Sequence, residues 1–172
     1  MSGVFDVYDT IELKGKNKSV IVTEGTYITK LKIKKDEIKM KIVVDGDEKK
    51  IKFKLKDGQR VPTGTTNFSF TASEVGQLYD VEGEIKTEVT YSETYSGTES
   101  CHSAPRPCTF RPGGGVYCPP SFPEYRSVTY RDKTVSRELS FELVSESQVP
   151  LAKFSGDDLS TSRDVVYRGM CY

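Results

Sequence analysis

The 172-residue chain has one histidine and no apolar run near the ~20 residues that a membrane-spanning helix needs. His102 is therefore the sole candidate base for a Ser-His-Asp hydrolase, and no Gly-x-Ser-x-Gly turn accompanies it. The glycine triplet at 113–115 is not followed by Lys-Ser/Thr, so it is not a phosphate-binding loop of the usual kind. We expect no enzyme, no catalytic residue and no cofactor.

Metal-ligand spacing is also missing. The four cysteines contain no C-x₂-C pair, and His102 directly follows Cys101, a poor arrangement for two ligands of one tetrahedral ion. Asp157 and Asp158 lack the oxygen-ligand spacing of a calcium loop. We expect no metal site, and a solvated turn at these two aspartates.

An even number of cysteines in a short, loop-rich chain favours two disulfides and therefore an exported protein. We predict Cys108 with Cys118, which closes a loop of about eleven residues, and Cys101 with Cys171. Four cysteines allow three connectivities, and free thiols would remove the argument for export. The amino terminus has no charged leader with an apolar core, so we expect that any export signal has been removed. The predicted location is the periplasm, the outer envelope or the medium.

The net charge is zero, but the charges are unevenly distributed. Residues 1–65 hold 15 Lys and Arg against 10 Asp and Glu, whereas residues 66–172 hold 10 against 15. Attraction between the two parts within one domain is the simpler interpretation. End-to-end association of molecules is the alternative.

Alternation with a period of two dominates the chain, and it is clearest within residues 27–56. If the chain turns at Lys35-Asp36, paired residues sum to 71, so Leu31 lies beside Met40. A second turn, at residues 45–48, has the strong hairpin signal Asp-Gly. The pattern predicts a three-stranded antiparallel meander with apolar side chains on one face and lysines on the other.

The lysines of that second face are opposed to one another: Lys30, Lys32, Lys39, Lys41, Lys52 and Lys54. Like charges directly opposite each other are destabilising, so this face is either fully solvated or binds an anionic polymer. Acidic glycan and lipid headgroups fit, whereas nucleic acid is not expected because the aromatic residues face inward. Simple solubilisation of the sheet is the alternative.

Further strands are expected at 67–72, 79–95, 125–144, 151–154 and 164–167, with a turn or single helical turn at 73–77. The apolar phase of 125–144 changes near 131–133, which predicts a bulge or extra turn. We predict one all-β domain over residues 1–172, an antiparallel sandwich or up-and-down barrel of about eight or nine strands.

Residues 97–124 differ from the rest, since they hold six of the eight prolines and three of the four cysteines. We interpret this segment as a disulfide-stapled, Pro/Gly-rich loop within the domain. Phe110, Arg111 and Tyr117 are its candidate binding residues, because aromatics and Arg dominate interface hot spots. The alternative is a staple that only protects the segment from proteolysis.

Two motifs carry a resemblance to a known group. They are Lys-Phe-Lys-Leu-Lys-Asp-Gly with Val-Pro at 52–62, and Phe-Thr-Ala-Ser-Glu-Val-Gly-Gln-Leu-Tyr-Asp-Val at 70–81. With the Tyr/Thr-rich strand and the Cys-rich segment that follow, they resemble uncharacterised envelope lipoproteins of Gram-negative bacteria, over roughly residues 25–172. The resemblance implies an exported β protein and brings no activity or site residues. The lipid-bearing cysteine of such lipoproteins has no counterpart here.

Our functional hypothesis is a non-catalytic extracytoplasmic binding or structural protein that contacts a macromolecule through residues 101–124. A lipocalin-like carrier with an internal cavity and a hydrolase inhibitor presenting the stapled loop are the alternatives. The partner is a protein or an anionic envelope polymer. Peripheral or lipid-anchored membrane association and the oligomeric state stay open.

Overall fold

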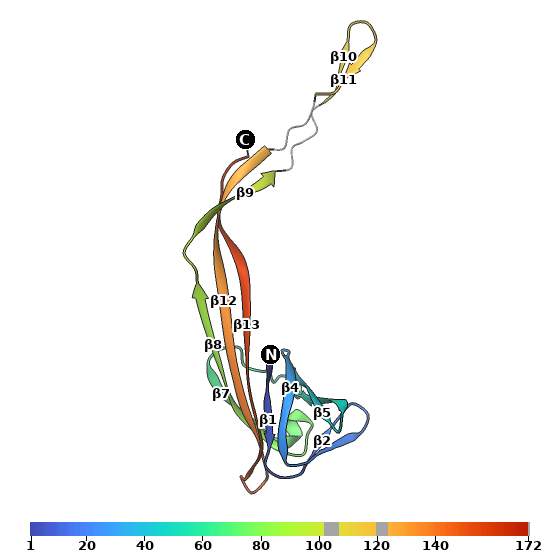
Figure 1. Ribbon diagram of the computed structural model, residues 1–172, viewed down its shortest axis with the longest axis vertical. Helices are drawn as coiled ribbons and strands as arrows, with labels where there is room; N and C mark the ends of the chain where they lie inside the picture. The colour runs from blue at the N-terminus through green and yellow to red at the C-terminus, as the bar shows by residue number, and fades with distance from the viewer. Residues whose placement is uncertain (102–106, 120–123, 172) are drawn as a thin grey trace. The chain divides into compact units, whose positions relative to one another are not determined.

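The computed structural model describes residues 1–101, 107–119 and 124–171 (Figure 1). Within these ranges the chain is almost entirely strand, with the single helical turn α1 (Ala72–Val75). The strands are β1 Ser2–Val7, β2 Ile11–Lys14, β3 Ser19–Val22, β4 Gly25–Ile33, β5 Glu37–Val44, β6 Asp47–Lys54, β7 Thr66–Phe70, β8 Asp80–Tyr91, β9 Tyr95–Cys101, β10 Thr109–Arg111, β11 Gly115–Tyr117, β12 Glu124–Val144 and β13 Pro150–Arg168. No helix of the described ranges is long and apolar enough to cross a membrane.

The main sheet is antiparallel and curled, in the manner of a half-barrel, which confirms the predicted fold class. Its strand order is β6-β5-β4-β1-β13-β12-β8-β7, and β9 pairs with β12. Two small sheets, β2-β3 and β10-β11, accompany it. The inner face of the sheet holds the core, because successive strand side chains point to opposite faces.

Contacts between residues divide the chain into two compact units. Unit 1 comprises Met1–Val89 and Val135–Ser160, and unit 2 comprises Thr90–Thr134 and Thr161–Tyr172. β12 is one uninterrupted strand through 131–133, where its apolar phase changes. That change of phase coincides with the division between the units, so each unit has its own pattern of buried residues.

The predicted meander is confirmed as β4-β5-β6. Leu31 pairs with Met40, and Met40 in turn pairs with Ile51. The turn between β5 and β6 is formed by Asp45 and Gly46, both at positive φ (53° and 83°), as a two-residue hairpin turn of the right twist requires. The register arithmetic therefore places the buried apolar side chains of the meander on the predicted face, whereas Ile28 and Val43 point outward.

The first strand, which sequence analysis leaves unassigned, lies in the middle of the sheet. β1 pairs with β4 on one side and with β13 on the other. Its Phe5 is fully buried between Tyr27 and Phe154, its partners on these two strands. The strand that completes the centre of the curled sheet thus comes from the start of the chain.

Two expected boundaries differ from the structure. Residues 79–95 do not form one strand, since β8 ends at Tyr91 and β9 begins at Tyr95. Residues 150–168 form the single strand β13 rather than two strands. Residues 97–101 belong to β9, and residues 102–106 and 120–123 of the expected loop, including His102, lie outside the described residues.

The expectation of a solvated turn at Asp157-Asp158 is wrong. Both residues lie within β13, where Asp157 pairs with Ser2. The neighbouring pair, Gly3 opposite Gly156, explains why β13 continues through this segment. A Cβ at either glycine would stand 2.6 Å from the ring of Phe154, so the two glycines make room for a buried aromatic instead of marking a turn.

The core of unit 1 is packed with aromatic side chains. Phe141 packs edge-on against Phe53 at 5.8 Å between ring centroids and stacks on Phe154 at 5.3 Å. Beside this core, the buried side chain of Gln77 donates to the backbone carbonyls of Lys14 (3.1 Å) and Lys52 (2.7 Å) and accepts from the Lys14 amide (2.8 Å). Gln77 therefore ties β2 to the outer edge of β6, where backbone groups would otherwise lack partners.

Candidate functional site

The segment 108–118 forms a small hairpin that we call the stapled hairpin. Its strands β10 and β11 pair through Thr109–Tyr117, Phe110–Val116 and Arg111–Gly115. Gly113 and Gly114 turn the chain at positive φ (114° and 91°), a conformation that favours glycine. The disulfide Cys108–Cys118 joins the two ends, with 4.1 Å between the Cα atoms, so this predicted pairing is confirmed.

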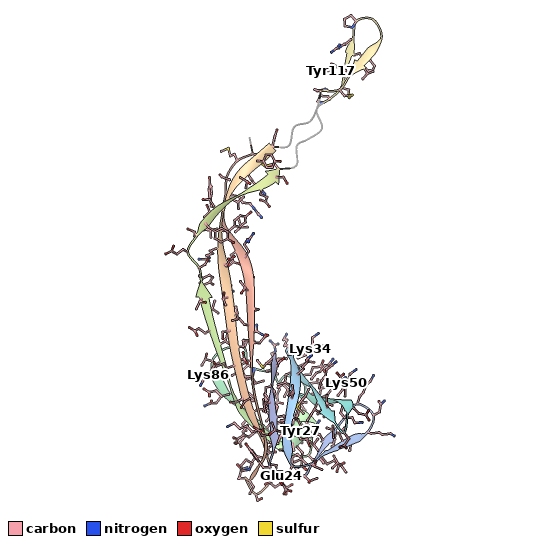
Figure 2. All side chains as sticks on the ribbon, viewed as in Figure 1. Glu24, Tyr27, Lys34, Lys50, Lys86 and Tyr117 are labelled. Atoms are coloured by element: carbon pink, nitrogen blue, oxygen red, sulfur yellow. A yellow bond between two sulfur atoms is a disulfide. The ribbon has the colours of Figure 1, made fainter. Side chains whose placement is uncertain are left out.

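The three candidate binding residues of the hairpin are divided between its two faces. Arg111 and Tyr117 share one face, where the guanidinium carbon lies 4.6 Å from the ring centroid. Figure 2 labels Tyr117 on this hairpin. Phe110 occupies the other face beside Val116, because directly paired residues point the same way. The exposed fractions of Phe110 and Val116 are 85% and 59%.

Val116 is the member of this group that sequence analysis missed. The signal was available, because pairing Cys108 with Cys118 makes all paired residues of the hairpin sum to the same value. That arithmetic places Val116 opposite Phe110. The hairpin therefore presents an apolar face and a cationic-aromatic face, and the residues of both faces are exposed.

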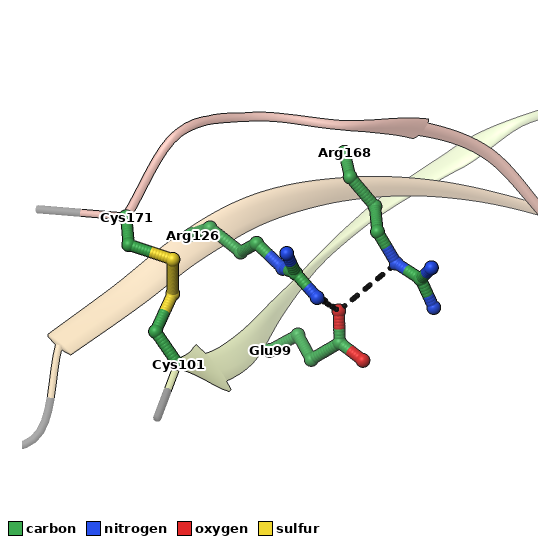
Figure 3. Close-up of a disulfide and its surroundings, with 5 residues drawn as sticks. All are labelled: Glu99, Cys101, Arg126, Arg168 and Cys171. Carbon is green, nitrogen blue, oxygen red and sulfur yellow. Dashed lines mark hydrogen bonds and ion pairs between the residues drawn. A yellow bond between two sulfur atoms is a disulfide. The ribbon is translucent and has the colours of Figure 1, made fainter. Parts of the chain in front are cut away.

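The second disulfide, Cys101–Cys171, lies beside a network of ion pairs (Figure 3). Glu99 accepts from Arg126 Nη2 at 2.7 Å and from Arg168 Nε at 3.2 Å. Hydrogen bonding by Arg126, followed by the charges of both arginines, lowers the pKa of Glu99 below its ordinary value. This group joins three strands, β9, β12 and β13, next to the bridge, and the predicted pairing of Cys101 with Cys171 is confirmed.

Unit 2 also holds an arrangement of arginine and tyrosine that sequence analysis missed. The guanidinium of Arg163 lies 5.5 Å from the Tyr95 ring centroid and 5.1 Å from that of Tyr130. The Tyr95 hydroxyl donates to Asp132 Oδ1 at 2.9 Å, and burial followed by this bond raises the pKa of Tyr95. Arg163 Nε also lies 3.7 Å from Asp132 Oδ1, so we interpret the cluster as structural.

The lysines predicted to share a face do so. We call the set Lys30, Lys32, Lys39, Lys41, Lys50, Lys52 and Lys54 the lysine face. Lys30 pairs with Lys41 and Lys41 with Lys50, while Lys39 lies between Lys32 and Lys52. Lys50, which sequence analysis left out of the candidate set, belongs to it by register.

Two glutamates interrupt the lysine face. Glu37 lies 3.0 Å from the Nζ atoms of both Lys34 and Lys39, and Glu48 lies 3.0 Å from Lys41 Nζ. Hydrogen bonding by Lys39, and then by Lys34, lowers the pKa of Glu37 to about 2. Part of the repulsion among the lysines is therefore relieved within the protein.

The hollows of unit 1 are open grooves on its outer surface. The largest is about 620 Å³ and crosses β7, β8, β12 and β13, where Glu82, Glu84 and Glu142 line it. The interior below is filled by the aromatic core. Among the described residues no group of three or more His, Cys, Asp or Glu side chains is arranged to hold a metal ion.

Comparisons with known protein families, curated proteins and solved structures give no match to this chain. Fold and bridges together define a class: a disulfide-bearing all-β protein. The two disulfides indicate an oxidising, extracytoplasmic environment, since glutathione and thioredoxin keep cytosolic thiols reduced.

Proposed function

We propose that the protein is a non-catalytic extracytoplasmic binding module that contacts a partner protein through the stapled hairpin. The observation that carries the proposal is Phe110, whose side chain is 85% exposed on a hairpin closed by a disulfide. An exposed aromatic gains free energy only when another surface covers it. Interface hot spots are enriched in aromatic residues and arginine, the residue types that the hairpin displays.

The staple supports this role because it limits the entropy that binding removes. A closed loop of about ten residues has far fewer conformations than a free one, so less ordering is needed when the partner arrives. Both faces of the hairpin carry a contact pair: Phe110 with Val116, and Arg111 with Tyr117. A cleft on the partner that admits the whole hairpin would use all four side chains.

For location, we propose the periplasm, the outer envelope or the medium. Both disulfides support an exported protein. The resemblance of residues 25–172 to envelope lipoproteins favours the envelope among these places. That resemblance also leaves lipid anchoring as part of the proposal.

Capture of the partner from native envelope or medium tests the role of the hairpin. The triple variant Phe110→Ser, Arg111→Ser and Tyr117→Ser should lose the partner that the wild-type protein captures, with an unchanged melting temperature. A matched variant carries Tyr125→Ser, Arg137→Ser and Tyr167→Ser, which likewise removes two exposed aromatic residues and one exposed arginine, all outside the hairpin. It should capture the partner normally. Intact capture by the hairpin variant would refute the proposal.

A further inference from the structure

The outer face of strands β1, β4 and β5 carries three exposed apolar side chains that lie side by side across the strands. In an antiparallel sheet with one solvated face, outward positions are normally polar. Here Val4 pairs with Ile28, and the next step of the β4-β5 register places Val43 beside Ile28. The exposed fractions of these side chains are 40% for Val4, 80% for Ile28 and 53% for Val43. We call these three residues the aliphatic row.

The aliphatic row lies directly beside the lysine face. The next outward positions on β4 and β5 lie two residues farther along each strand, about 7 Å from the aliphatic row. They are Lys30 on β4 and Lys41 on β5. Lys32 and Lys39 form the next level, and β6 extends both levels with Lys50 and Lys52. The Cα atoms of neighbouring lysines therefore stand on a grid of about 5 by 7 Å that borders three exposed aliphatic side chains.

This face keeps a strong positive charge after its internal ion pairs are counted. Glu37 and Glu48 contact Lys39, Lys41 and Lys50. No described residue forms an ion pair with the other four: Lys30, Lys32, Lys52 and Lys54.

The hairpin β2-β3 adds one more cation at the edge. Gly15 forms a bridge to Ile51, which brings Lys16 to the margin of a hollow of about 250 Å³. Lys39, Lys41, Lys50 and Lys52 line the same hollow. A single phosphate group entering it would meet several ammonium groups at once.

The geometry points to a docking surface for an anionic lipid bilayer, formed by the lysine face and the aliphatic row. A cationic grid alone would suit any anionic polymer. Aliphatic side chains at its border add free energy only where an apolar phase lies next to the charges, which is the arrangement at the boundary between headgroups and acyl chains. This surface is separate from the stapled hairpin, so a partner protein and a membrane could be bound by different parts of the chain.

Sedimentation with vesicles tests the proposal on the full, oxidised chain. The wild-type protein should bind vesicles of phosphatidylcholine mixed with phosphatidylglycerol and should not bind vesicles of phosphatidylcholine alone. Salt at about 1 M should release it, because the Debye length then falls to about 3 Å. Binding to both kinds of vesicle, or to neither, would overturn the proposal.

Two pairs of variants separate charge from apolar contact. Lys30→Gln with Lys41→Gln should weaken vesicle binding about 30-fold, from about 1 kcal/mol for each lysine. The control Lys86→Gln removes a lysine held by Glu84 on β8, four strands away from β4 in the sheet order. It should change binding less than about twofold, since screening limits distant charges. Figure 2 shows Lys50 and Lys86 on their respective strands.

The aliphatic row has its own test. Ile28→Ser should weaken binding about fivefold, from loss of roughly one inserted side chain. Ile21→Ser, an exposed isoleucine of the small β2-β3 sheet, should leave binding unchanged. Both variants should fold, because neither side chain is buried. If Ile28→Ser binds vesicles as the wild type does, or if heparin captures the protein while vesicles do not, the surface is a site for polyanions and the bilayer proposal is wrong.

Discussion

Glu37 is shared by two ammonium groups, those of Lys34, which directly follows β4, and of Lys39 on β5. Its pKa of about 2 lies below the ordinary value of 4.5, chiefly because Lys39 and then Lys34 donate hydrogen bonds to the carboxylate. A lowered pKa means that these bonds stabilise the folded protein fully above pH 4.5. The stabilisation is lost as the pH falls toward about 2.

We predict that Glu37 titrates near pH 2 in a carboxyl NMR experiment and that Lys39→Gln moves this midpoint toward 4.5. Lys49→Gln is the matched control, since Lys49 contacts Asp47 instead. The variant Glu37→Gln should lose less stability between these two pH values than the wild type. A Glu37 midpoint that is the same in wild type and Lys39→Gln would show that this ion pair does not form in solution.

At the scale of elements, the edges of the curled sheet depend on a few side-chain contacts. β6 is an edge strand of the main sheet, and an edge strand leaves backbone groups without hydrogen-bond partners. Gln77 supplies one such partner to Lys52 and two to Lys14, while α1 is held by the bond from the Thr71 amide to Glu74. The core therefore stays closed beside β6 through a buried amide.

We predict that Gln77→Leu lowers the free energy of unfolding by about 2–4 kcal/mol, because three part-buried backbone groups lose the hydrogen-bond partner that the buried Gln77 amide provides. Urea denaturation measures the loss. Gln59→Leu is the control: it removes one bond, to the side chain of Glu74, and should cost about 1 kcal/mol or less. Equal losses in the two variants would mean that the Gln77 contacts add nothing beyond an ordinary surface bond.

The meander could be predicted from sequence because Lys and apolar residues alternate over most of it, with exceptions at Ile28 and Val43. β1 could not, since Val4, Phe5 and Val7 give no consistent parity. In the structure Phe5 and Val7 are buried while Val4 faces outward. β13 was divided in the prediction because Gly156 and the aspartates after it have the composition of a turn. Only the contact with Gly3 shows why a glycine stands there.

The candidate sites were predictable to the extent that they follow from register. Pairing within the meander specifies the lysine face, and pairing within the hairpin specifies which residues join Phe110. The acceptors Glu37 and Glu48 and the contribution of Lys16 depend on side-chain directions and on the bridge between Gly15 and Ile51. Local periodicity encodes neither the side-chain directions nor this bridge, which joins residues far apart in sequence.

At the scale of the whole molecule, both disulfides belong to unit 2, and unit 1 contains no cysteine. Stability of a chain is often distributed over cooperative units that open separately. Cross-links stabilise mainly the unit whose unfolded chain they restrict, by about 2–4 kcal/mol each. Cys101–Cys171 joins β9 to the segment after β13 and closes a loop that contains β12 and β13, whereas the strands β5 and β6 of the meander lie outside this loop.

Hydrogen exchange with and without reductant therefore makes a definite prediction. Reduction should lower amide protection in 95–101 and 124–130, where β9 pairs with β12, and should leave protection in β5 and β6 unchanged. Cys101→Ser with Cys171→Ser should reproduce the effect in oxidising buffer. Cys108→Ser with Cys118→Ser should affect only 109–117, because that bridge closes the hairpin alone. Equal loss of protection in β5 and β9 would mean that the two units unfold as one cooperative block.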